Sequence, residues 1–306
     1  MLELKTYQQR TLAKLSAYLE QSRLLNDPVA PFAPLREAHG YRETYKPLPG
    51  LKSIPYVCLR LPTGGGKTLL SAHTAAIAAD TCLETDYPLV LWLAPTDAIR
   101  KQTLETLRNP LHPNRQVLDK QFDGRVRVFD ITEFEQLRSQ DIGTAACVFV
   151  ATFGAFRVNS TDGRKVYAHN ENLEPHFSRV MLADWMDKKD DGQVKFSFAN
   201  LLGFHRPLVI VDEAHNHNTK LSEDVLNRVR AAAVIEYTAT PNAAKSNVLY
   251  KVSAAELKAE DMIKLPVRLS EYAAWTDAVH GAIQARARLE VLSGAEDEYI
   301  RPIILF

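Results

Sequence analysis

The stretch CLRLPTGGGKTLLSAHTAA, residues Cys58–Ala76, decides the fold of this chain. It places three consecutive glycines, followed by Lys67 and Thr68, between an apolar run and an alanine-rich run. One interpretation is a flexible turn that joins two elements. The other is a loop whose backbone N–H groups surround a phosphate at the start of a helix, where the helix dipole favours negative charge.

The phosphate-loop interpretation gives each residue a chemical reason. Side chains at Gly64 and Gly66 would block the approach of the phosphate. Lys67 would reach the β- and γ-phosphates, and Thr68 would offer its hydroxyl to Mg²⁺. Leu61 stands where the general pattern has glycine, so this stretch alone leaves both interpretations open.

A second stretch, PLVIVDEAHNH at residues 207–217, favours the phosphate loop. Four apolar residues precede Asp212 and Glu213, which therefore emerge at the C-terminal end of a buried strand, where open α/β sheets bind ligands. One carboxylate can hold Mg²⁺, and the next can orient or deprotonate an attacking water. His215 and His217 have no cysteine or carboxylate partner beyond this site, so zinc is not expected.

Short β-rich runs alternate with helical patterns, which predicts a doubly wound α/β fold with a mostly parallel sheet and helices on both faces. The expected strands are Tyr56–Arg60, Leu89–Ala94, Val126–Asp130, Cys147–Thr152, Leu208–Asp212 and Val234–Tyr237. The expected helices are Thr6–Leu25, Lys67–Ala79 and Thr96–Asn109. The polar segment from about residue 157 to 203 interrupts this rhythm, and we expect it to be a surface insertion.

Composition limits the possible partners and the compartment. Lysine plus arginine and aspartate plus glutamate number 37 each, so a nucleic-acid site has to be a local patch. The three cysteines have no paired spacing, and Cys58 and Cys147 fall in apolar runs, which indicates buried thiols in a reducing compartment. No signal sequence or long apolar run is present, which predicts a cytoplasmic protein without a membrane partner.

Three motifs resemble those of superfamily-two helicases of the DEAD/DEAH group: PTGGGKT, VDEAH and TATP are similar to motifs I, II and III. These helicases commonly have a residue other than glycine at the position of Leu61. Tyr7 and Gln8 are similar to the upstream glutamine motif, LAPTDAIRKQ resembles motif Ia, and VATFGAF resembles a later backbone-contacting motif. The resemblance implies a RecA-like domain that hydrolyses ATP with Mg²⁺.

The resemblance also implies roles for individual residues. Asp212, Glu213 and Lys67 are the expected catalytic residues, with Thr68 and Asp212 on the metal and Glu213 as the base. The expected nucleotide-binding residues are Gln8, which reads the adenine, and Thr63, Gly64, Gly65, Gly66, Lys67 and Thr68, with Gly65 at a freely variable position. The residues expected to couple nucleotide and nucleic acid are His215, Thr238, Ala239 and Thr240. The expected contacts to the nucleic-acid backbone are Thr96, Gln102, Thr152 and Phe153.

The proline-rich lead-in, the long insertion before residue 206 and the final YIRPIILF look most like the restriction (Res) subunit of type III restriction enzymes. This resemblance implies a DNA helicase or translocase that couples Mg-ATP hydrolysis to movement on double-stranded DNA. Its expected partners are a methyltransferase subunit, a second RecA-like domain and a nuclease domain. The alternatives are a repair or RNA helicase of the same superfamily, and a nucleotide-dependent scaffold without motor activity.

We expect the chain to have three parts. Residues 1–55 form an N-terminal helix with a proline-rich connection, residues 56–268 the ATP-binding domain, and residues 269–306 a linker helix and the first strand of a second RecA-like domain. Since that second domain supplies arginine fingers, whose loss can cost ~10³–10⁵ in turnover, we expect the chain by itself to bind nucleotide and hydrolyse it weakly.

Overall fold

The computed structural model describes residues 3–156, 165–178, 183–213, 220–262 and 270–294. The chain divides into two compact units, Met1–Ile263 and Lys264–Phe306, and each is described by itself. The sheet and the predicted site residues belong to the first unit.

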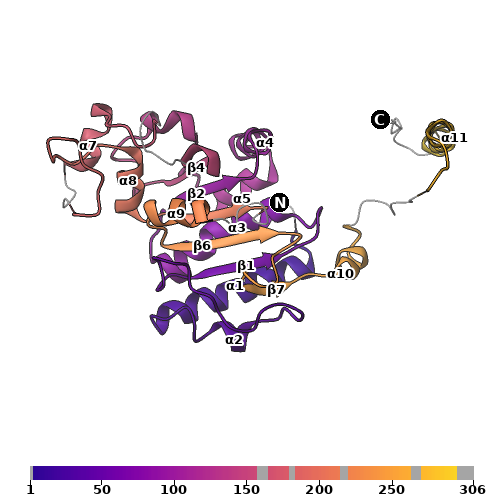
Figure 1. The fold of residues 1–306 in the computed structure, drawn as a ribbon, viewed down its shortest axis with the longest axis horizontal. Coiled ribbons are helices and arrows are strands. Elements are labelled where there is room, and N and C mark those ends of the chain that lie inside the picture. The colour runs from indigo at the N-terminus through magenta and orange to yellow at the C-terminus, as the bar shows by residue number, and fades with distance from the viewer. Residues whose placement is uncertain (1–2, 157–164, 179–182, 214–219, 263–269, 295–306) are drawn as a thin grey trace. The chain divides into compact units, whose positions relative to one another are not determined.

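A seven-stranded sheet in the order β3-β4-β2-β5-β6-β1-β7 forms the centre of the first unit (Figure 1). The strands are β1 (Tyr56–Arg60), β2 (Leu89–Ala94), β3 (Val126–Asp130), β4 (Ala146–Thr152), β5 (Leu208–Asp212), β6 (Ala233–Thr238) and β7 (Val248–Lys251). Each neighbouring pair is parallel, which confirms the predicted RecA-like α/β fold. The loops after β1, β5 and β6 therefore emerge from the same edge.

All six expected strands are present, and four of them, β1, β2, β3 and β5, have the predicted bounds. In contrast, β4 begins one residue earlier and β6 extends one residue at each end. The short strand β7 was not expected. It adds to the free edge of β1, with Cys58 opposite Val248, and its four residues form too short a run to give a clear sequence pattern.

Helices cover both faces of the sheet. On one face lie α1 (Thr6–Leu24), α3 (Lys67–Ala78), α4 (Asp97–Arg108) and α5 (Pro113–Gln121), with α5 packed against both α3 and α4. Thr74 of α3 is 2.6 Å from the Tyr237 hydroxyl of β6. On the other face lie α8 (Phe198–His205) and α9 (Lys220–Arg228), and the ring centroids of Phe198 and of Phe149 in β4 are 4.7 Å apart.

The expected helices differ from the observed ones only at their ends. The helix expected at Thr6–Leu25 ends at Leu24, and α3 passes at Ala79 into a π-helical turn, Ala79–Leu83. Thr96 is the N-cap of α4 rather than its first residue, because its Oγ1 accepts a hydrogen bond from the Ile99 N–H at 3.3 Å. The shorter helical segments are α2 (Phe32–Leu35), Ile131–Gln136, α6 (Phe153–Phe156), Glu171–Leu173, α7 (Glu174–Phe177) and α10 (Ala254–Ala259).

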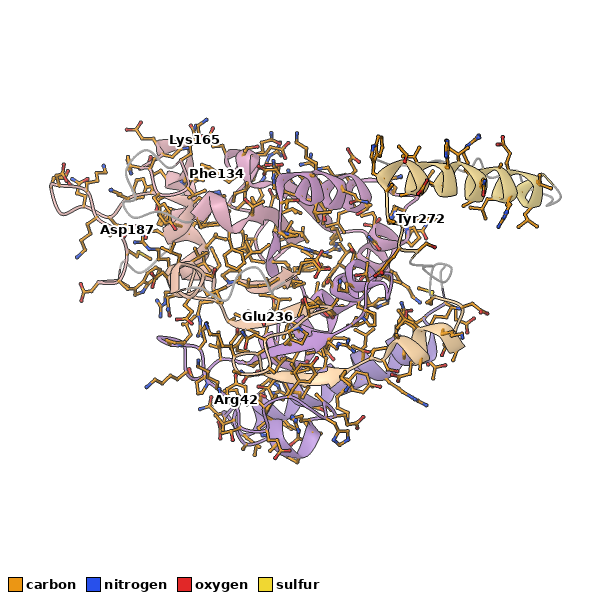
Figure 2. The ribbon with its side chains drawn as sticks, turned by 45° about the vertical axis from the view of Figure 1, so that its right-hand side comes forward. Arg42, Phe134, Lys165, Asp187, Glu236 and Tyr272 are labelled. Atoms are coloured by element: carbon orange, nitrogen blue, oxygen red, sulfur yellow. The ribbon has the colours of Figure 1, made fainter. Side chains whose placement is uncertain are left out.

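The strands are buried on both faces, as expected for parallel strands between helical layers. Figure 2 shows side chains filling the space around the sheet, with Phe134 and Glu236 both inside the first unit. Phe134 stacks on Phe198 with ring centroids 5.0 Å apart. Cys58 and Cys147 are buried free thiols, as predicted, and burial raises the pKa of the Cys147 thiol to about 12.

The segment expected to be a surface insertion has two kinds of residue in its described part. The charged stretch Lys188–Gln193 is mostly exposed and contains the turn at Gly192. In contrast, Tyr167, Leu173 and Phe198 are fully buried and belong to the main hydrophobic core. The described part therefore supplies one wall of the core as well as a solvated loop.

The proline-rich connection is fastened to the sheet by Asn247, which is 1% exposed. The Asn247 amide accepts a hydrogen bond from the Lys46 N–H at 2.8 Å and donates to the Lys46 carbonyl at 2.9 Å. It also donates to the Tyr56 carbonyl of β1 at 2.9 Å. One side chain thus replaces the backbone pairing that a proline-rich segment lacks.

The second unit contains α11 (Trp275–Ser293) in its described part. Gly294 closes this helix by donating its N–H to the Glu290 carbonyl at 3.0 Å. The strand expected from YIRPIILF lies outside the described residues. Among the helices that the structure describes, none has the length and apolar character required to cross a membrane.

Asn247→Ala is expected to lower the free energy of unfolding by about 2–4 kcal/mol, because it leaves backbone groups of Lys46 and Tyr56 without their partner. Urea denaturation followed by circular dichroism measures this loss. Asn172→Ala, at an exposed position, is the matched control and should change stability by less than about 0.5 kcal/mol. Equal losses in the two variants would contradict the fastening role of Asn247.

Candidate ATP-binding site

The glycine loop joins β1 to α3 in a conformation that requires glycine at two positions. Gly64 and Gly66 have φ angles of +84° and +78°, in the left-handed region that side chains disfavour. Gly66 is also the N-cap of α3, so the loop ends where the helix dipole begins. A Cβ on Gly66 would lie 2.6 Å from Nε2 of Gln8, so a side chain there would displace the Gln8 amide from the loop.

Gly65 was expected at a freely variable position, but its surroundings restrict which residue can stand there. It is buried, and a Cβ there would lie 3.0 Å from the Pro62 carbonyl oxygen, so a side chain would need the loop to shift. Its own carbonyl accepts a hydrogen bond from the Tyr7 hydroxyl at 3.1 Å and from Gln8 Nε2 at 3.4 Å. Two side chains of α1, Tyr7 and Gln8, therefore restrain the loop through these hydrogen bonds.

Gln8 lies against the glycine loop and is 2% exposed. Its Oε1 accepts a hydrogen bond from the Lys5 N–H at 3.0 Å, and its Nε2 donates to the loop, so both ends of the amide are engaged. The location next to the loop agrees with a nucleotide-binding residue. Its reading of an adenine remains a prediction. The Tyr7 contact was not predicted as part of the site, although Tyr7 precedes Gln8 in the quoted motif.

Asp212 and Glu213 lie at the carboxyl end of β5, as the apolar run before them predicts. Glu213 forms a salt bridge with Lys67, whose side chain is 10% exposed. Glu213 also has a left-handed φ of +51°, uncommon for a residue with a side chain and frequent at functional sites. The structure thus brings together the lysine and carboxylate from two motifs that are 146 residues apart.

Asp212 has the character expected of a metal ligand. It is 6% exposed, and its Oδ1 has no hydrogen-bond partner among the described residues. Burial raises its pKa to about 6, the neighbouring Glu213 carboxylate adds to the increase, and Lys67 opposes it. A bound divalent cation would favour the ionised form and would occupy the unpartnered oxygen. The Thr68 hydroxyl likewise makes no hydrogen bond within the part of the chain that the structure describes, so this pair fits Mg²⁺.

One cleft of about 430 Å³ connects the two motifs. Eight predicted site residues line it: Thr63, Gly64, Gly66, Lys67, Thr68, Gln102, Asp212 and Glu213. Six further lining residues were not predicted: Pro95, Ile99, Thr103, Thr106, His112 and Asn114. These six come from the end of β2 and from α4 and α5. Pro95 and Ile99 lie within the quoted LAPTDAIRKQ stretch but were not named as site residues, and no motif marked the other four.

The predicted coupling residues follow β6. Thr238 is fully buried, its carbonyl accepts from the Leu61 N–H at 3.0 Å, and its Oγ1 accepts from the Thr240 N–H at 3.2 Å. Arg60 donates to the Ala239 carbonyl at 3.2 Å. The segment is therefore bonded directly to the residues that lead into the glycine loop. His215 lies outside the described residues.

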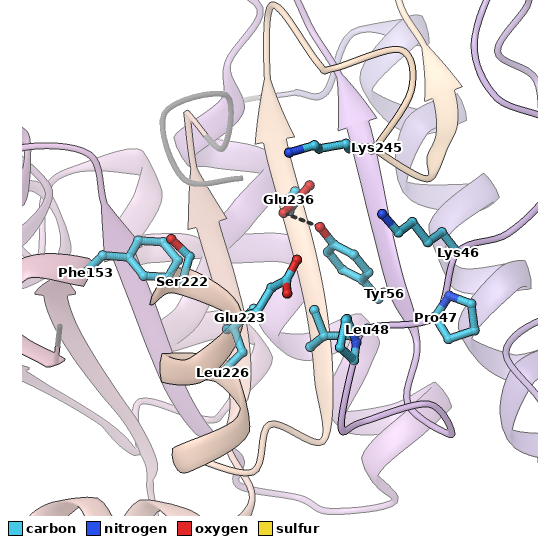
Figure 3. Close-up of a pocket in the computed structure, with 11 residues that line it drawn as sticks. Lys46, Pro47, Leu48, Tyr56, Phe153, Ser222, Glu223, Leu226, Glu236 and Lys245 are labelled. Atoms are coloured by element: carbon cyan, nitrogen blue, oxygen red, sulfur yellow. Dashed lines mark hydrogen bonds between the residues drawn. The ribbon is translucent and has the colours of Figure 1, made fainter. Parts of the chain in front are cut away.

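The four residues predicted to contact nucleic acid occupy different environments. Thr96 caps α4, and Gln102 is exposed on α4 and lines the cleft. Thr152 is half-buried at the end of β4. Phe153 is only 2% exposed and lines a second cavity on the other face of the sheet (Figure 3).

That second cavity surrounds a buried carboxyl group, Glu236, which is 5% exposed (Figure 3). The Tyr56 hydroxyl donates to Glu236 Oε1 at 2.9 Å, and Oε2 has no hydrogen-bond partner among the described residues. Lys46, Glu223 and Lys245 extend toward the same space in Figure 3. Burial raises the pKa of Glu236 to about 7, while the Tyr56 hydrogen bond lowers it.

The comparisons with known proteins place the chain in a family. The family model described as "Type III restriction enzyme, res subunit" matches residues 1–243. The chain belongs to this family. The predicted resemblance to superfamily-two helicases of the restriction-subunit kind is thereby confirmed at the level of the family, and the match includes all the motifs quoted above.

Solved structures give distant matches. The type ISP restriction-modification enzyme LlaGI, with a DNA substrate mimic, is 14% identical with a TM-score of 0.42, covering 97% of this chain and 23% of that one. The Sulfolobus solfataricus SWI2/SNF2 ATPase core with dsDNA is 15% identical with a TM-score of 0.36, covering 78% and 32%. The Pyrococcus furiosus Hef helicase domain is 19% identical with a TM-score of 0.32, covering 63% and 31%. The chain thus spans less than a third of each of these three proteins. Among curated proteins, none matches the chain.

Replacing Glu236 by Gln is expected to remove a pH dependence of stability. In the wild type the folded state keeps the proton up to a pKa of about 7, whereas the unfolded chain releases it near 4.5, so stability falls as pH rises through this window. The size of this effect is about 3 kcal/mol at most. Glu236→Gln should therefore be more stable than wild type at pH 8, by about 1–3 kcal/mol, and similar at pH 5.

Urea denaturation at pH 5 and pH 8 measures this difference. Glu105→Gln, which makes the same change at an exposed position of α4, is the control. Wild-type and Glu236→Gln stabilities that change in parallel with pH would contradict the ionisation of Glu236 in this window.

Proposed function

We propose that this chain is the ATP-binding motor domain of a DNA helicase or translocase, a type III restriction subunit or a related defence helicase. The observation that supports this most directly is the salt bridge between Lys67 and Glu213 beside the unpartnered Oδ1 of Asp212. A phosphate-binding lysine, a buried metal-ligating carboxylate and a candidate base meet at one cleft. That combination is the minimum that nucleotide hydrolysis requires from this type of site.

In the proposed mechanism, the loop N–H groups and Lys67 bind the β- and γ-phosphates of ATP. Thr68 and Asp212 would hold Mg²⁺, which when bound neutralises negative charge on the phosphate oxygens. Lys67 then exchanges its pairing with Glu213 for the phosphates. Glu213, released from the lysine, can accept a proton from the attacking water. Thr238 and Ala239, bonded to Leu61 and Arg60, would transmit the change in the loop toward bound nucleic acid.

The proposed partners follow from the same assignment. Double-stranded DNA is the proposed track, and a methyltransferase subunit, a second RecA-like domain and a nuclease domain are the proposed companions in a complete enzyme. The family membership supports this proposal, and the net charge of zero requires the DNA contact to be a local surface.

Lys67→Ala is expected to weaken Mg²⁺-dependent ADP and ATP binding by at least about tenfold, since it removes a charged contact to phosphate. Isothermal titration calorimetry of the purified chain measures the dissociation constants. Lys101→Ala, which removes an exposed lysine from α4, is the matched control and should leave them unchanged. Affinities that are the same in wild type and Lys67→Ala would contradict the phosphate-loop assignment.

Glu213→Gln distinguishes a motor from a nucleotide-dependent scaffold. If Glu213 is the base, this variant keeps nucleotide binding but reduces ATP turnover by about 10²–10⁴-fold, the usual contribution of a positioned general base. The measurement is phosphate release by the complete enzyme with DNA present. Unchanged turnover and DNA translocation in Glu213→Gln would argue against the catalytic role.

A further inference from the structure

One wall of the cleft consists mostly of polar residues from α4 and the start of α5, of which only Ile99 and Gln102 belong to a quoted motif. Ile99, Gln102, Thr103 and Thr106 follow the i, i+3, i+4, i+7 spacing of one helix face, so α4 presents this face to the cleft. His112 and Asn114, at the start of α5, line the same cleft. Lys67, Thr68, Asp212 and Glu213 line the same half-open cleft.

Part of this wall is held in place by its own hydrogen bonds. Thr106 donates from Oγ1 to the Thr103 carbonyl at 2.9 Å, and the Asn114 amide donates to Thr106 Oγ1 at 3.4 Å. Asn114 is 6% exposed, so this contact fixes α5 against α4. The structural residues of the wall are therefore Thr103, Thr106 and Asn114.

Gln102 and His112 each have a polar side-chain atom that makes no hydrogen bond with another described residue. The Gln102 side chain makes no hydrogen bond with any described residue. His112 Nδ1 accepts from the Asn114 N–H at 3.2 Å, so in the neutral ring the proton is on Nε2. Both residues can thus donate a hydrogen bond: Gln102 through its amide and His112 through Nε2.

The two acidic residues that line the cleft, Asp212 and Glu213, both lie at the end of β5. The lining residues from α4 and α5 include no carboxylate, so this side of the cleft does not repel an anion. Asp212 is more than nine-tenths buried with an unpartnered Oδ1, which independently indicates a ligand at this place. A phosphate group held by the loop would therefore share this cleft with the donors of Gln102 and His112.

We propose that Gln102 and His112 are positioning residues for the terminal phosphate group: they contact the γ-phosphate of ATP and, after hydrolysis, the inorganic phosphate. This inference rests on the proposed function and makes it more specific. It also gives Gln102 a different role from the nucleic-acid contact that the resemblance to motif Ia implies. Gln102 and His112 act on the part of the ligand that distinguishes ATP from ADP.

The test compares the affinity for Mg-ADP with that for Mg-ADP plus beryllium fluoride, which occupies the γ-phosphate position. Gln102→Ala and His112→Asn should each reduce the gain in affinity from beryllium fluoride by about tenfold, while ADP affinity changes less than about twofold. His112→Asn keeps an N-cap acceptor for α5 but removes the Nε2 donor, so helix capping is preserved. Calorimetry on the purified chain gives both affinities, and a thermal melt confirms folding.

Two controls separate this inference from the proposed function. Lys101→Ala should keep both affinities, and Lys67→Ala should weaken both. If wild type binds nucleotide but shows no gain from beryllium fluoride, or if both wall variants keep the full gain, the positioning role is overturned while the phosphate loop stands. If wild type binds no nucleotide, both proposals are overturned. DNA affinity that falls in Gln102→Ala, with the beryllium fluoride gain intact, would restore the nucleic-acid role instead.

Discussion

The parallel pairing of β5, β6 and β1 is the constraint on which the site depends. Asp212 pairs with Tyr237 and Arg60 with Thr238, so the three strands end almost level at one edge of the sheet. The segments that follow these ends are the glycine loop, Asp212–Glu213 and the Thr238–Thr240 segment. Because the strands are buried on both faces, a slip in this register would expose apolar residues on two sides at once. The register therefore brings Lys67 to Glu213 as a consequence of core packing.

Three acidic side chains on or just after β5 and β6 differ in pKa and in partners because of where they lie. Asp212 is buried at the cleft, and its pKa rises to about 6, a value that cation binding can offset. Glu213, one residue later, reaches the surface of the cleft and pairs with Lys67. Glu236 points to the opposite face, where burial raises its pKa to about 7 beside the Tyr56 hydroxyl. Only the first two line the cleft where phosphate would bind.

Much of the fold could be predicted from the sequence, because six of the strands are apolar runs separated by helical patterns. The short edge strand β7 could not, since Val248–Lys251 has no period of its own and gains its order from β1. The chemical core of the site, Lys67, Thr68, Asp212 and Glu213, was also predictable, because each residue belongs to a compact motif. The α4–α5 wall was not, because His112 and Asn114 reach the cleft through packing between helices. Phe153 belongs to a recognisable segment and its side chain is buried, so its contact with nucleic acid stays a prediction.

The glycine loop is already shaped for a phosphate before one binds. Tyr7 and Gln8 hold the Gly65 carbonyl, and the strand pairing that ends at Thr238 fixes Leu61. Little backbone entropy therefore remains to be lost when a ligand enters, which favours affinity. The main energetic cost of phosphate binding is the loss of the Lys67–Glu213 salt bridge, because the phosphate takes the place of Glu213 beside the lysine. Since the lysine changes from one anionic partner to another, the net gain is the difference between two pairings, and the freed carboxylate is the group that the proposed hydrolysis needs next.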